Sequence, residues 1–336
     1  MFLCSFTSKG LLLAASAFLL TGITSFALAD NASYDKAFSN RNATGEELAN
    51  AFFDLLSNTG SPTGTVGTTA EQDEASKALV KPYLDPAFQL QRSSGERYIA
   101  ATYLPADVDD FEIGDAREVR PADDVLVVRY SVRTTETLPD AALVMSKDKA
   151  PRLTAFHWSD SDARWKVLSH ANFNTPVAAV CDKDPIVDNG LDSTATSEDQ
   201  ALGEGLMTRF YDLLVQGDAA PILNQLMQYQ SASGVGYTSL AERKKSTKLP
   251  RTEFSDAVVT RNQSLLVVSV YHQTSTERVL MQQTKLREGK SANLATFMQG
   301  SDGNWSMIAL ASFVPGKALP EGVQCVPSGP LEDAPL

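Results

Sequence analysis

One sequence pattern occurs twice in this chain of 336 residues. Residues 45–56 read GEELANAFFDLL and residues 203–214 read GEGLMTRFYDLL, so that Gly, Glu, Leu, Phe, Asp and two Leu recur at the same offsets. Further matches follow in the same order: VLVVRYSV at 125–132 with LLVVSVYH at 265–272, Trp165 with Trp305, and Phe173 with Phe313. The period is too long for a solenoid repeat of roughly 20–50 residues. We therefore interpret the chain as two copies of one domain.

The repeat and the chain length together predict the domain boundaries. At roughly 100–200 residues per domain, two domains are expected. The segment DKDPIVDNGLDSTATSEDQ between the copies is polar and acidic and has no periodicity, which is typical of a linker. We expect a leader at residues 1–29, copy one at 40–180, the linker at 181–200 and copy two at 201–328.

The first 29 residues have the layout of a cleavable secretory signal. Lys9 supplies a positive charge, residues 11–20 form the apolar run LLLAASAFLL, and Ala27–Ala29 form an A-x-A cleavage site. The alternative is a membrane anchor, but the strongly apolar core is short for the roughly 20 residues that a span needs. We expect a periplasmic or secreted protein without a membrane span after cleavage.

Two cysteines remain after the predicted cleavage, Cys181 and Cys325. An even number of cysteines in an oxidising compartment favours a disulfide between them. The alternative is two separate buried thiols. No spacing of Cys and His resembles a zinc or haem site, so we expect no metal.

The charge balance argues against a nucleic-acid partner. The chain has 29 Lys and Arg against 41 Asp and Glu, a formal net charge of −12, whereas phosphate contacts need clustered Lys and Arg. The sequence also has no phosphate-binding Gly-rich loop, no G-x-S-x-G nucleophile motif and no H-E-x-x-H zinc motif. We expect no cofactor.

Each copy begins with a helix and continues with strands. Leu48, Phe52 and Leu55 fall on one helical face, and Thr44 with Glu47 forms a capping box. A second helix is expected over 71–84, interrupted by Pro82. Strands are expected at 88–91, 100–103, 111–119, 125–134, 152–159 and 165–172. Helices followed by consecutive strands indicate an α+β fold with helices on an antiparallel sheet.

This order of elements resembles the nuclear transport factor 2-like superfamily, which includes the SnoaL-like domains. The residues that suggest it are ELANAFFDLL, PYLDPAFQLQRSSGERY, DVLVVRYSVRT, LTAFHW and RWKVLSHANFNTP. The resemblance implies two cone-shaped domains, each a curved antiparallel sheet wrapped around N-terminal helices, with a conical pocket at the open end. The alternatives are a cystatin-like helix-on-sheet arrangement and an unrelated α+β fold.

The histidines of copy one are the first candidates for chemistry in such a pocket. His157 and His170 lie on predicted adjacent strands, and imidazole is a general base near neutral pH. Strict alternation groups His157 with Leu153, and His170 with Leu168, so the two rings can face opposite sides of the sheet. The matched positions in copy two are Met298 and Leu310. The alternative is that both histidines are structural or lie on the surface.

Two arginines and two tyrosines are further candidates as ligand-binding residues. Arg129 and Arg133 share one strand face, and an inward Arg suits an anionic ligand, although the face can equally be the solvated one. Tyr98 and Tyr237 occupy matched positions and are either pocket hydroxyls or core aromatics. Asp115 and Asp256 follow the preceding Phe at different offsets, so no carboxylate base pairs with Tyr98.

These observations leave three functions open. The first is an exported tandem module that binds a small molecule or a protein without catalysis, with its two cones packed sheet to sheet. The second is an isomerase or dehydratase that uses a pocket in copy one, with His157, His170 and Tyr98 as the credible participants. The third is an assembly or structural protein of the cell envelope that pairs with another protein through its sheet surface.

Overall fold

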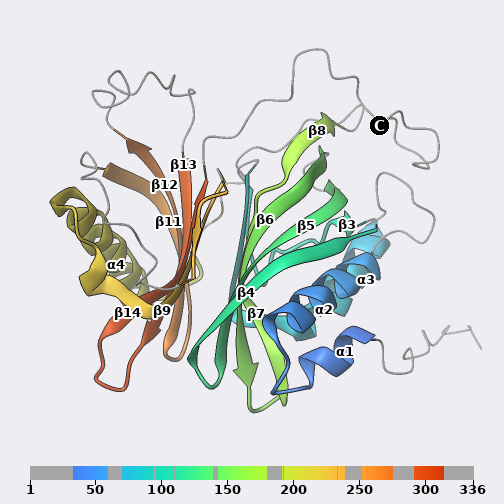
Figure 1. Cartoon of the computed structure of the whole chain (residues 1–336), viewed down its shortest axis with the longest axis horizontal. Helices are drawn as coiled ribbons and strands as arrows, with labels where there is room; N and C mark the ends of the chain where they lie inside the picture. The colour runs from blue at the N-terminus through green and yellow to red at the C-terminus, as the bar shows by residue number, and fades with distance from the viewer. Residues whose placement is uncertain are drawn as a thin grey trace, which may run out of the picture. The chain divides into compact units, whose positions relative to one another are not determined.

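A computed structural model of the chain gives the fold (Figure 1). The structure describes residues 33–59, 70–93, 96–108, 110–138, 143–179, 191, 193–232, 234–238, 252–274 and 291–313. The predicted leader, Cys181 and Cys325 lie outside these residues, so signal cleavage and the disulfide stay predictions. None of the helices in the described residues is both long enough and apolar enough to span a membrane.

The first half of the molecule, residues 33–179, places its helices before its strands. Its elements are α1 (Ser33–Phe38), α2 (Gly45–Ser57), α3 (Ala70–Val80), the 3-10 helix η1 (Lys81–Tyr83), β1 (Leu84–Arg92), β2 (Arg97–Ile99), β3 (Asp107–Val108), β4 (Glu112–Ala122), β5 (Val125–Leu138), β6 (Leu143–Ser159), β7 (Arg164–Asn172) and β8 (Thr175–Ala179). The strands form one sheet in the order β2-β1-β7-β6-β5, in which β3 and β4 both pair with β5, and β8 pairs with β6.

The second half, residues 193–313, repeats this arrangement. Its elements are α4 (Ser197–Gln216), the 3-10 helix η2 (Ala220–Ile222), β9 (Leu223–Ser231), β10 (Gly236–Tyr237), β11 (Thr252–Asn262), β12 (Leu265–Thr274), β13 (Ser291–Gln299) and β14 (Trp305–Phe313). The sheet order β10-β9-β14-β13-β12-β11 matches the order β2-β1-β7-β6-β5-β4 of the first half, whereas β3 and β8 have no counterpart within the described residues. The α+β class is therefore confirmed. Helix α4 begins at Ser197, inside the segment predicted as linker.

Three details differ from the expected elements. Each sheet is mixed, because β1 runs parallel to β7 and β9 runs parallel to β14, whereas the other pairs are antiparallel as predicted. Residues 100–102 form a turn after the short strand β2, although a strand was expected at 100–103. The helix expected over 71–84 ends at Val80, and Pro82 lies in η1, since proline cannot continue an α-helix.

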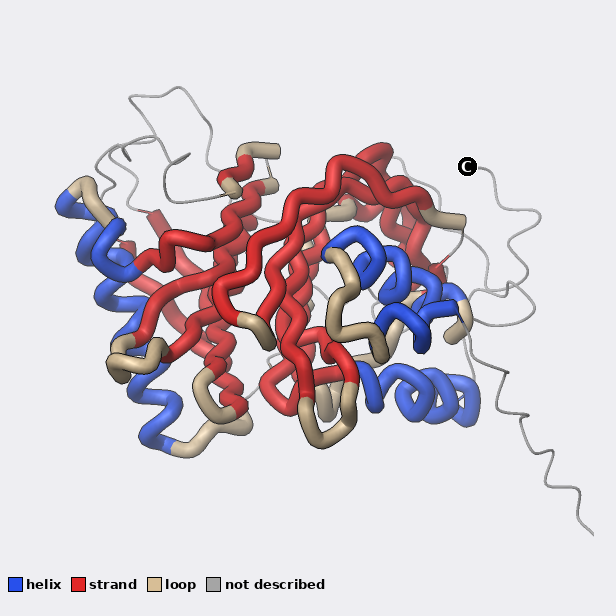
Figure 2. Tube along the Cα trace, turned by 60° about the horizontal axis from the view of Figure 1, so that its bottom comes forward, coloured by secondary structure: helices blue, strands red, loops and turns tan. Residues whose placement is uncertain are grey.

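In each half the helices cover one face of the half's own sheet (Figure 1 and Figure 2). The capping box forms as predicted, because Glu47 N–H donates to Thr44 Oγ1 at 3.2 Å and Thr44 N–H donates to Glu47 Oε2 at 2.7 Å. Helix α2 buries Leu48, Phe52 and Leu55 completely against the sheet. We call this helix-covered face the concave face of each sheet.

The repeated glycines explain how closely each helix approaches its sheet. A Cβ on Gly45 would lie 2.9 Å from Cβ of Val128, and a Cβ on Gly203 would lie 2.7 Å from Cγ2 of Val259. Real Cβ atoms do not come so close, so a side chain at either position would push the helix off the sheet. The Gly that recurs in the two copies is therefore required by packing.

The opposite faces of the two sheets pack on each other, as the sheet-to-sheet expectation proposed. The rings of Phe173 and Phe313 stack there with centroids 4.5 Å apart and planes 19° apart. Buried residues from both sheets surround them: Val125, Val127, Leu153, Ala155, Leu168, Leu265, Val267, Leu294, Ile308 and Ala311. A partner on the sheet surface stays a prediction, and within the described residues these two faces are already covered by each other.

Buried glutamines repeat one contact in both directions across this interface. Gln89 Nε2 donates to the carbonyl oxygen of Val258 at 3.0 Å, and Gln228 Nε2 donates to the carbonyl oxygen of Arg117 at 2.8 Å. Arg117 and Val258 each follow by two residues an Asp with positive φ, Asp115 at 55° and Asp256 at 54°. The two halves are therefore related by an approximate two-fold axis, with matched residues in matched roles.

The same aspartates correct one sequence interpretation. Asp115 and Asp256 are structurally equivalent, because each lies in a β-bulge, where the pairing shifts between Gly114 and Arg117 and between Ser255 and Val258. Counting from the preceding Phe suggested that they do not correspond. The count failed because Phe111 and Phe254 are not counterparts, since Phe254 corresponds in register to Ile113.

Candidate functional site

The concave face of the first sheet carries seven buried polar residues. We call this group the concave cluster: Tyr130 and Glu136 from β5, Arg152 and Thr154 from β6, His170 and Asn172 from β7, and the following Asn174. Each member has at most 4 % of its surface exposed. Helix α2 covers the cluster, since the rings of Phe52 and His170 lie 5.1 Å apart and those of Phe53 and Tyr130 lie 6.3 Å apart.

A buried ion pair forms one part of the cluster. Arg152 Nη2 donates to Glu136 Oε1 at 2.6 Å, with both side chains almost fully removed from solvent. The Glu136 carboxylate also accepts hydrogen bonds from Asn172 Nδ2 at 2.6 Å and from Asn174 Nδ2 at 3.1 Å. Three donors therefore satisfy this one buried carboxylate.

A hydrogen-bonded chain of neutral groups forms the other part. Thr154 Oγ1 lies 2.8 Å from Nδ1 of His170 and 3.0 Å from the Tyr130 hydroxyl oxygen. Burial, followed by the positive charges of Arg152 and Arg92, lowers the pKa of His170 well below its ordinary value. Burial likewise raises the pKa of Tyr130 above its ordinary value. The imidazole and the phenol are therefore both uncharged near neutral pH.

Some polar atoms of the concave cluster have no hydrogen-bond partner within the described part of the chain. They are Nε of Arg152, a donor, and Oδ1 of Asn174, an acceptor. Both residues are completely buried, and an unpaired buried polar atom costs roughly 1–3 kcal/mol. The cluster is thus an incomplete network, in which one donor and one acceptor are available to another molecule.

The second half shows what the same fold contains without such a cluster. The strand registers align Tyr130 with Val270, Arg152 with Asn293, Thr154 with Ala295, and His170 with Leu310. The second concave face is lined mainly by apolar residues, among them Met207, Phe210, Leu214, Met227, Phe297 and Met307. One polar contact there joins Asn293 Nδ2 to the Tyr211 hydroxyl at 2.7 Å, and Asn293 Oδ1 has no partner among the described residues.

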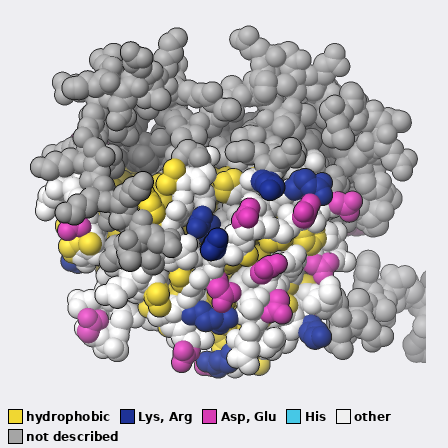
Figure 3. Space-filling view, viewed as in Figure 1, with side chains coloured by type: hydrophobic (Ala, Val, Ile, Leu, Met, Phe, Trp, Pro, Cys, Tyr) yellow, Lys and Arg dark blue, Asp and Glu magenta, His cyan; other side chains and the backbone are white. Residues whose placement is uncertain are grey.

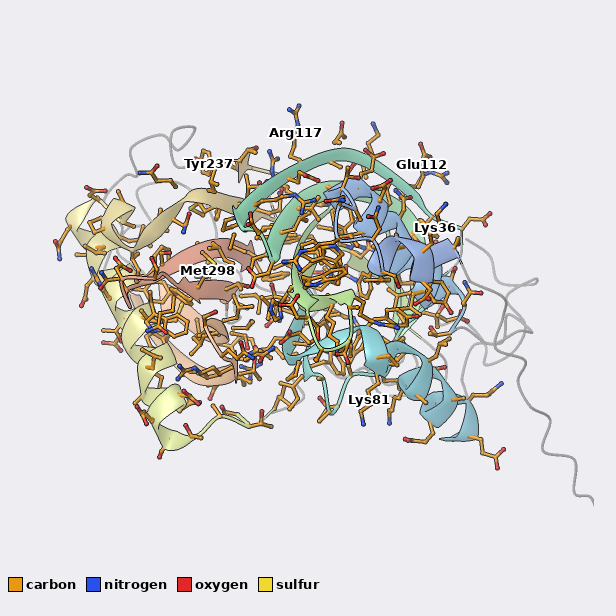
Figure 4. All side chains as sticks on the ribbon, turned by 90° about the horizontal axis from the view of Figure 1, so that it is seen from below. Lys36, Lys81, Glu112, Arg117, Tyr237 and Met298 are labelled. Carbon is orange, nitrogen blue, oxygen red and sulfur yellow. The ribbon has the colours of Figure 1, made fainter. Side chains whose placement is uncertain are left out.

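The structure separates the two candidate histidines. His170 belongs to the concave cluster, whereas His157 faces the second half, where its Nδ1 lies 2.8 Å from Asp85 Oδ2. Asp85 also accepts a hydrogen bond from Asn262 Nδ2 of the second half at 3.0 Å. The ring of His157 is therefore part of the contact between the halves, and its counterpart Met298 is labelled in Figure 4.

Strict alternation along β7 would place Leu168 and His170 on the same face of the sheet, but the structure places them on opposite faces. Ala155 pairs with Ser169 and Phe156 with Val167, so Leu168 forms a bulge. Because of this bulge, Leu168 packs between the sheets while His170 turns to the concave face. The second half has the same bulge at Ile308, between the pairs Thr296 with Ala309 and Phe297 with Met307.

The candidate arginines do not enter the concave face. Arg129 reaches the second half, where its Nη2 donates to Thr238 Oγ1 at 3.0 Å. Arg133 is exposed and its Nη2 lies 3.0 Å from Glu112 Oε2. Arg152, on the neighbouring strand, does enter this face.

The matched tyrosines have different surroundings. Tyr98 is buried, and the Arg92 guanidinium lies 4.9 Å from its ring centroid. Tyr237 is partly exposed and stacks on Tyr229 with ring centroids 5.5 Å apart (Figure 4). The ligand-binding roles of both tyrosines stay predictions.

Sequence reasoning missed most of the concave cluster. The signal that could have found it is that polar side chains of copy one are not kept at the matched positions of copy two. The residues that correspond to Tyr130, Arg152 and Thr154 in copy two are smaller or apolar. By the offset that relates Phe173 to Phe313, Glu136 and Asn174 correspond to Thr276 and Val314, which lie outside the described residues.

Two open hollows lie along the outer side of α2, away from the concave cluster. One, of about 580 Å³, is lined by Glu46, Glu47, Asp54 and Phe111, and the other, of about 630 Å³, by Ser57, Val108, Asp110 and Phe111. Glu47 already closes the capping box, and Asp54 accepts from Ser33 Oγ.

Acidic and basic side chains are interspersed over the described part of the face seen in Figure 3. Within the described residues, no three His, Cys, Asp or Glu come together as metal ligands.

Comparison with known proteins gives structural matches only. No protein-family model matches the chain, and no curated protein matches it. A nuclear transport factor 2-like protein from Cytophaga hutchinsonii is 18% identical with a TM-score of 0.28, covering 36% of this chain and 99% of the solved one. A cystatin-like fold protein from Burkholderia xenovorans is 12% identical with a TM-score of 0.30, covering 37% and 96%. A nuclear transport factor 2-like protein from Pseudomonas putida is 9% identical with a TM-score of 0.30, covering 39% and 95%.

Proposed function

We propose that this protein is an exported tandem binding module whose first half holds a small molecule at the concave cluster. The second half then serves as the structural counterpart that covers the outer face of the first sheet. The observation that carries the proposal is the contrast between the two concave faces. The first contains a buried ion pair and a neutral histidine, whereas the second is largely apolar.

The duplication makes this contrast informative. A buried ion pair seldom adds net stability over apolar residues of similar volume, because two charges lose their hydration. The second half keeps the same strand order with Asn293, Ala295 and Leu310 at the matched positions, so the fold does not require the cluster. Residues that cost stability and are dispensable for the fold are expected at functional sites.

The test is analysis of small molecules released from natively purified protein. The wild-type chain is compared with Asn174→Leu, which removes the unpaired acceptor, and with Asn293→Leu, the same substitution at a buried Asn of the second half whose Oδ1 is also unpaired among the described residues. We expect one compound to be extracted from the wild type and Asn293→Leu but not from Asn174→Leu. Equal amounts from all three proteins, or no compound from any of them, would contradict the proposal.

Export is supported by the leader pattern at residues 1–29. The proposal predicts that the protein recovered from the cell begins at Asp30. Intact mass measurement of that protein checks the cleavage site, and a mass that includes residues 1–29 would count against export.

A second candidate function is proton-transfer catalysis in the same half, of isomerase or dehydratase type. The observation in its favour is His170, a neutral imidazole whose Nδ1 is held by Thr154. A fixed neutral imidazole can act as a general base through its other nitrogen. If the wild type converts the extracted compound and His170→Leu does not, the first half is an enzyme and not only a binding module.

A further inference from the structure

The ligand class follows from the charges of the concave cluster, and this inference rests on the proposed function. The positive charge of Arg152 is matched by Glu136, and both oxygens of Glu136 are already occupied by donors. On the adjacent hairpin β1 and β2, buried Arg92 is accompanied by buried Glu96. Within the described residues, two guanidinium groups and two carboxylates therefore balance in number.

The titratable neighbours add no charge. The lowered pKa of His170 keeps its ring neutral, and the raised pKa of Tyr130 keeps its hydroxyl protonated. The other buried arginine nearby, Arg97, is directed toward the second half, where its Nη1 lies 2.5 Å from the carbonyl oxygen of Asp256. An ionised ligand would therefore enter a dry site without a counter-charge, which is strongly unfavourable.

The unpaired atoms give the hydrogen-bonding pattern. Arg152 Nε offers a donor. The Nδ2 of Asn174 points at Glu136, which fixes the amide so that its Oδ1 is the free acceptor. The aromatic rings of Phe52 and Phe53 border the same cluster and provide an apolar wall. A matching molecule needs an acceptor, an N–H or O–H donor, an apolar part and no charge.

We infer that the ligand of the first half is an uncharged molecule of the carboxamide or lactam type, and that carboxylates and ammonium ions are excluded. The carbonyl oxygen accepts from Arg152 Nε and the amide N–H donates to Asn174 Oδ1. The site offers no counter-charge to an ionised analogue with the same apolar part, so such an analogue binds at least tenfold more weakly.

The test uses benzamide, benzoate and benzylammonium as probes of one carbon skeleton. The chain has three His, so the imidazole NMR signals of histidine-labelled full-length protein are few, and His170→Leu assigns the signal of His170. We expect benzamide to shift the His170 signal saturably, while benzoate and benzylammonium at the same concentrations do not. The benzamide affinity should fall at least tenfold in Asn174→Leu and stay unchanged in Asn293→Leu.

The outcomes separate this inference from the proposed function. A shift of His170 by benzoate or benzylammonium, without one by benzamide, overturns the neutral class and leaves a binding site in the first half. No shift by any probe overturns the class as well, and the extraction experiment then decides whether the binding function stands. An undiminished benzamide effect in Asn174→Leu overturns the assigned contact.

Discussion

His170 shows how one residue can depart from what its sequence neighbours suggest. Strict alternation groups it on one face with Leu168, but the bulge leaves Leu168 between the sheets and turns His170 to the concave face. A bulge adds one residue to one strand and inverts the alternation beyond it. Neither Leu168 nor its counterpart Ile308 differs in type from an ordinary strand residue, so the sequence offers no sign of the bulge.

The lowered pKa of His170 predicts an acid-sensitive stability. Near an unfolded pKa of about 6.5 the unfolded chain takes up a proton that the folded ring does not accept. Stability is therefore lost as the pH falls below about 6.5 toward the folded pKa, by up to about 1.4 kcal/mol per pH unit. His170→Leu, the residue type of the second half, should flatten this dependence in urea titrations between pH 7 and pH 5. Identical slopes for both proteins would show that His170 is not the responsible group.

At the scale of elements, the helices were the most predictable part of the fold. The capping box of Thr44 and Glu47 and the apolar stripe of α2 are local signals, and the structure has both. Strands β3 and β8 were missed, because each is short and is defined by pairing with the distal ends of β5 and β6. Such pairing depends on residues far apart in the sequence, which local patterns do not contain.

The matched glycines, Gly45 in α2 and Gly203 in α4, yield a prediction at this scale. Gly45→Ala and Gly203→Ala should each lower the free energy of unfolding by about 1–3 kcal/mol, because the added methyl group overlaps a strand valine. Gly205→Ala in α4 is the control, since a Cβ there meets nothing within 4 Å. That variant should gain about 0.5–1 kcal/mol through helix propensity. Urea unfolding measures all three, and equal effects at positions 45 and 205 would contradict the packing argument.

At the scale of the whole molecule, the duplication was predictable from the sequence, and the packing of the two halves on each other was partly predictable. The repeated motifs indicated two copies and a sheet-to-sheet arrangement. Gln89 recurs as Gln228 in copy two, but neither this repeat nor the residue type of Asp85 indicates that these residues join the halves. They are polar residues on strands, and the sequence cannot distinguish them from residues that face solvent.

The shared core predicts that the halves unfold together. Phe313→Ala in the second half removes the ring stacked on Phe173 and should cost about 3–5 kcal/mol. Hydrogen exchange of the β6 and β7 amides in the first half should accelerate by the same free energy. Leu226→Ala, at a side chain that is 45% exposed, should leave both quantities unchanged. Unaltered protection in the first half would mean that the halves are independent.

The concave cluster is central to the whole account, which holds that it serves binding at the expense of stability. The most direct measurement is the free energy of unfolding of the quadruple variant Glu136→Leu, Arg152→Met, Asn172→Leu and Asn174→Leu, beside the single variant Arg152→Met. We predict that the quadruple variant is at least as stable as the wild type, whereas the single variant loses about 3–5 kcal/mol through its uncompensated Glu136. A quadruple variant that is destabilised as much as the single one would show that the cluster is structural, and would contradict the account.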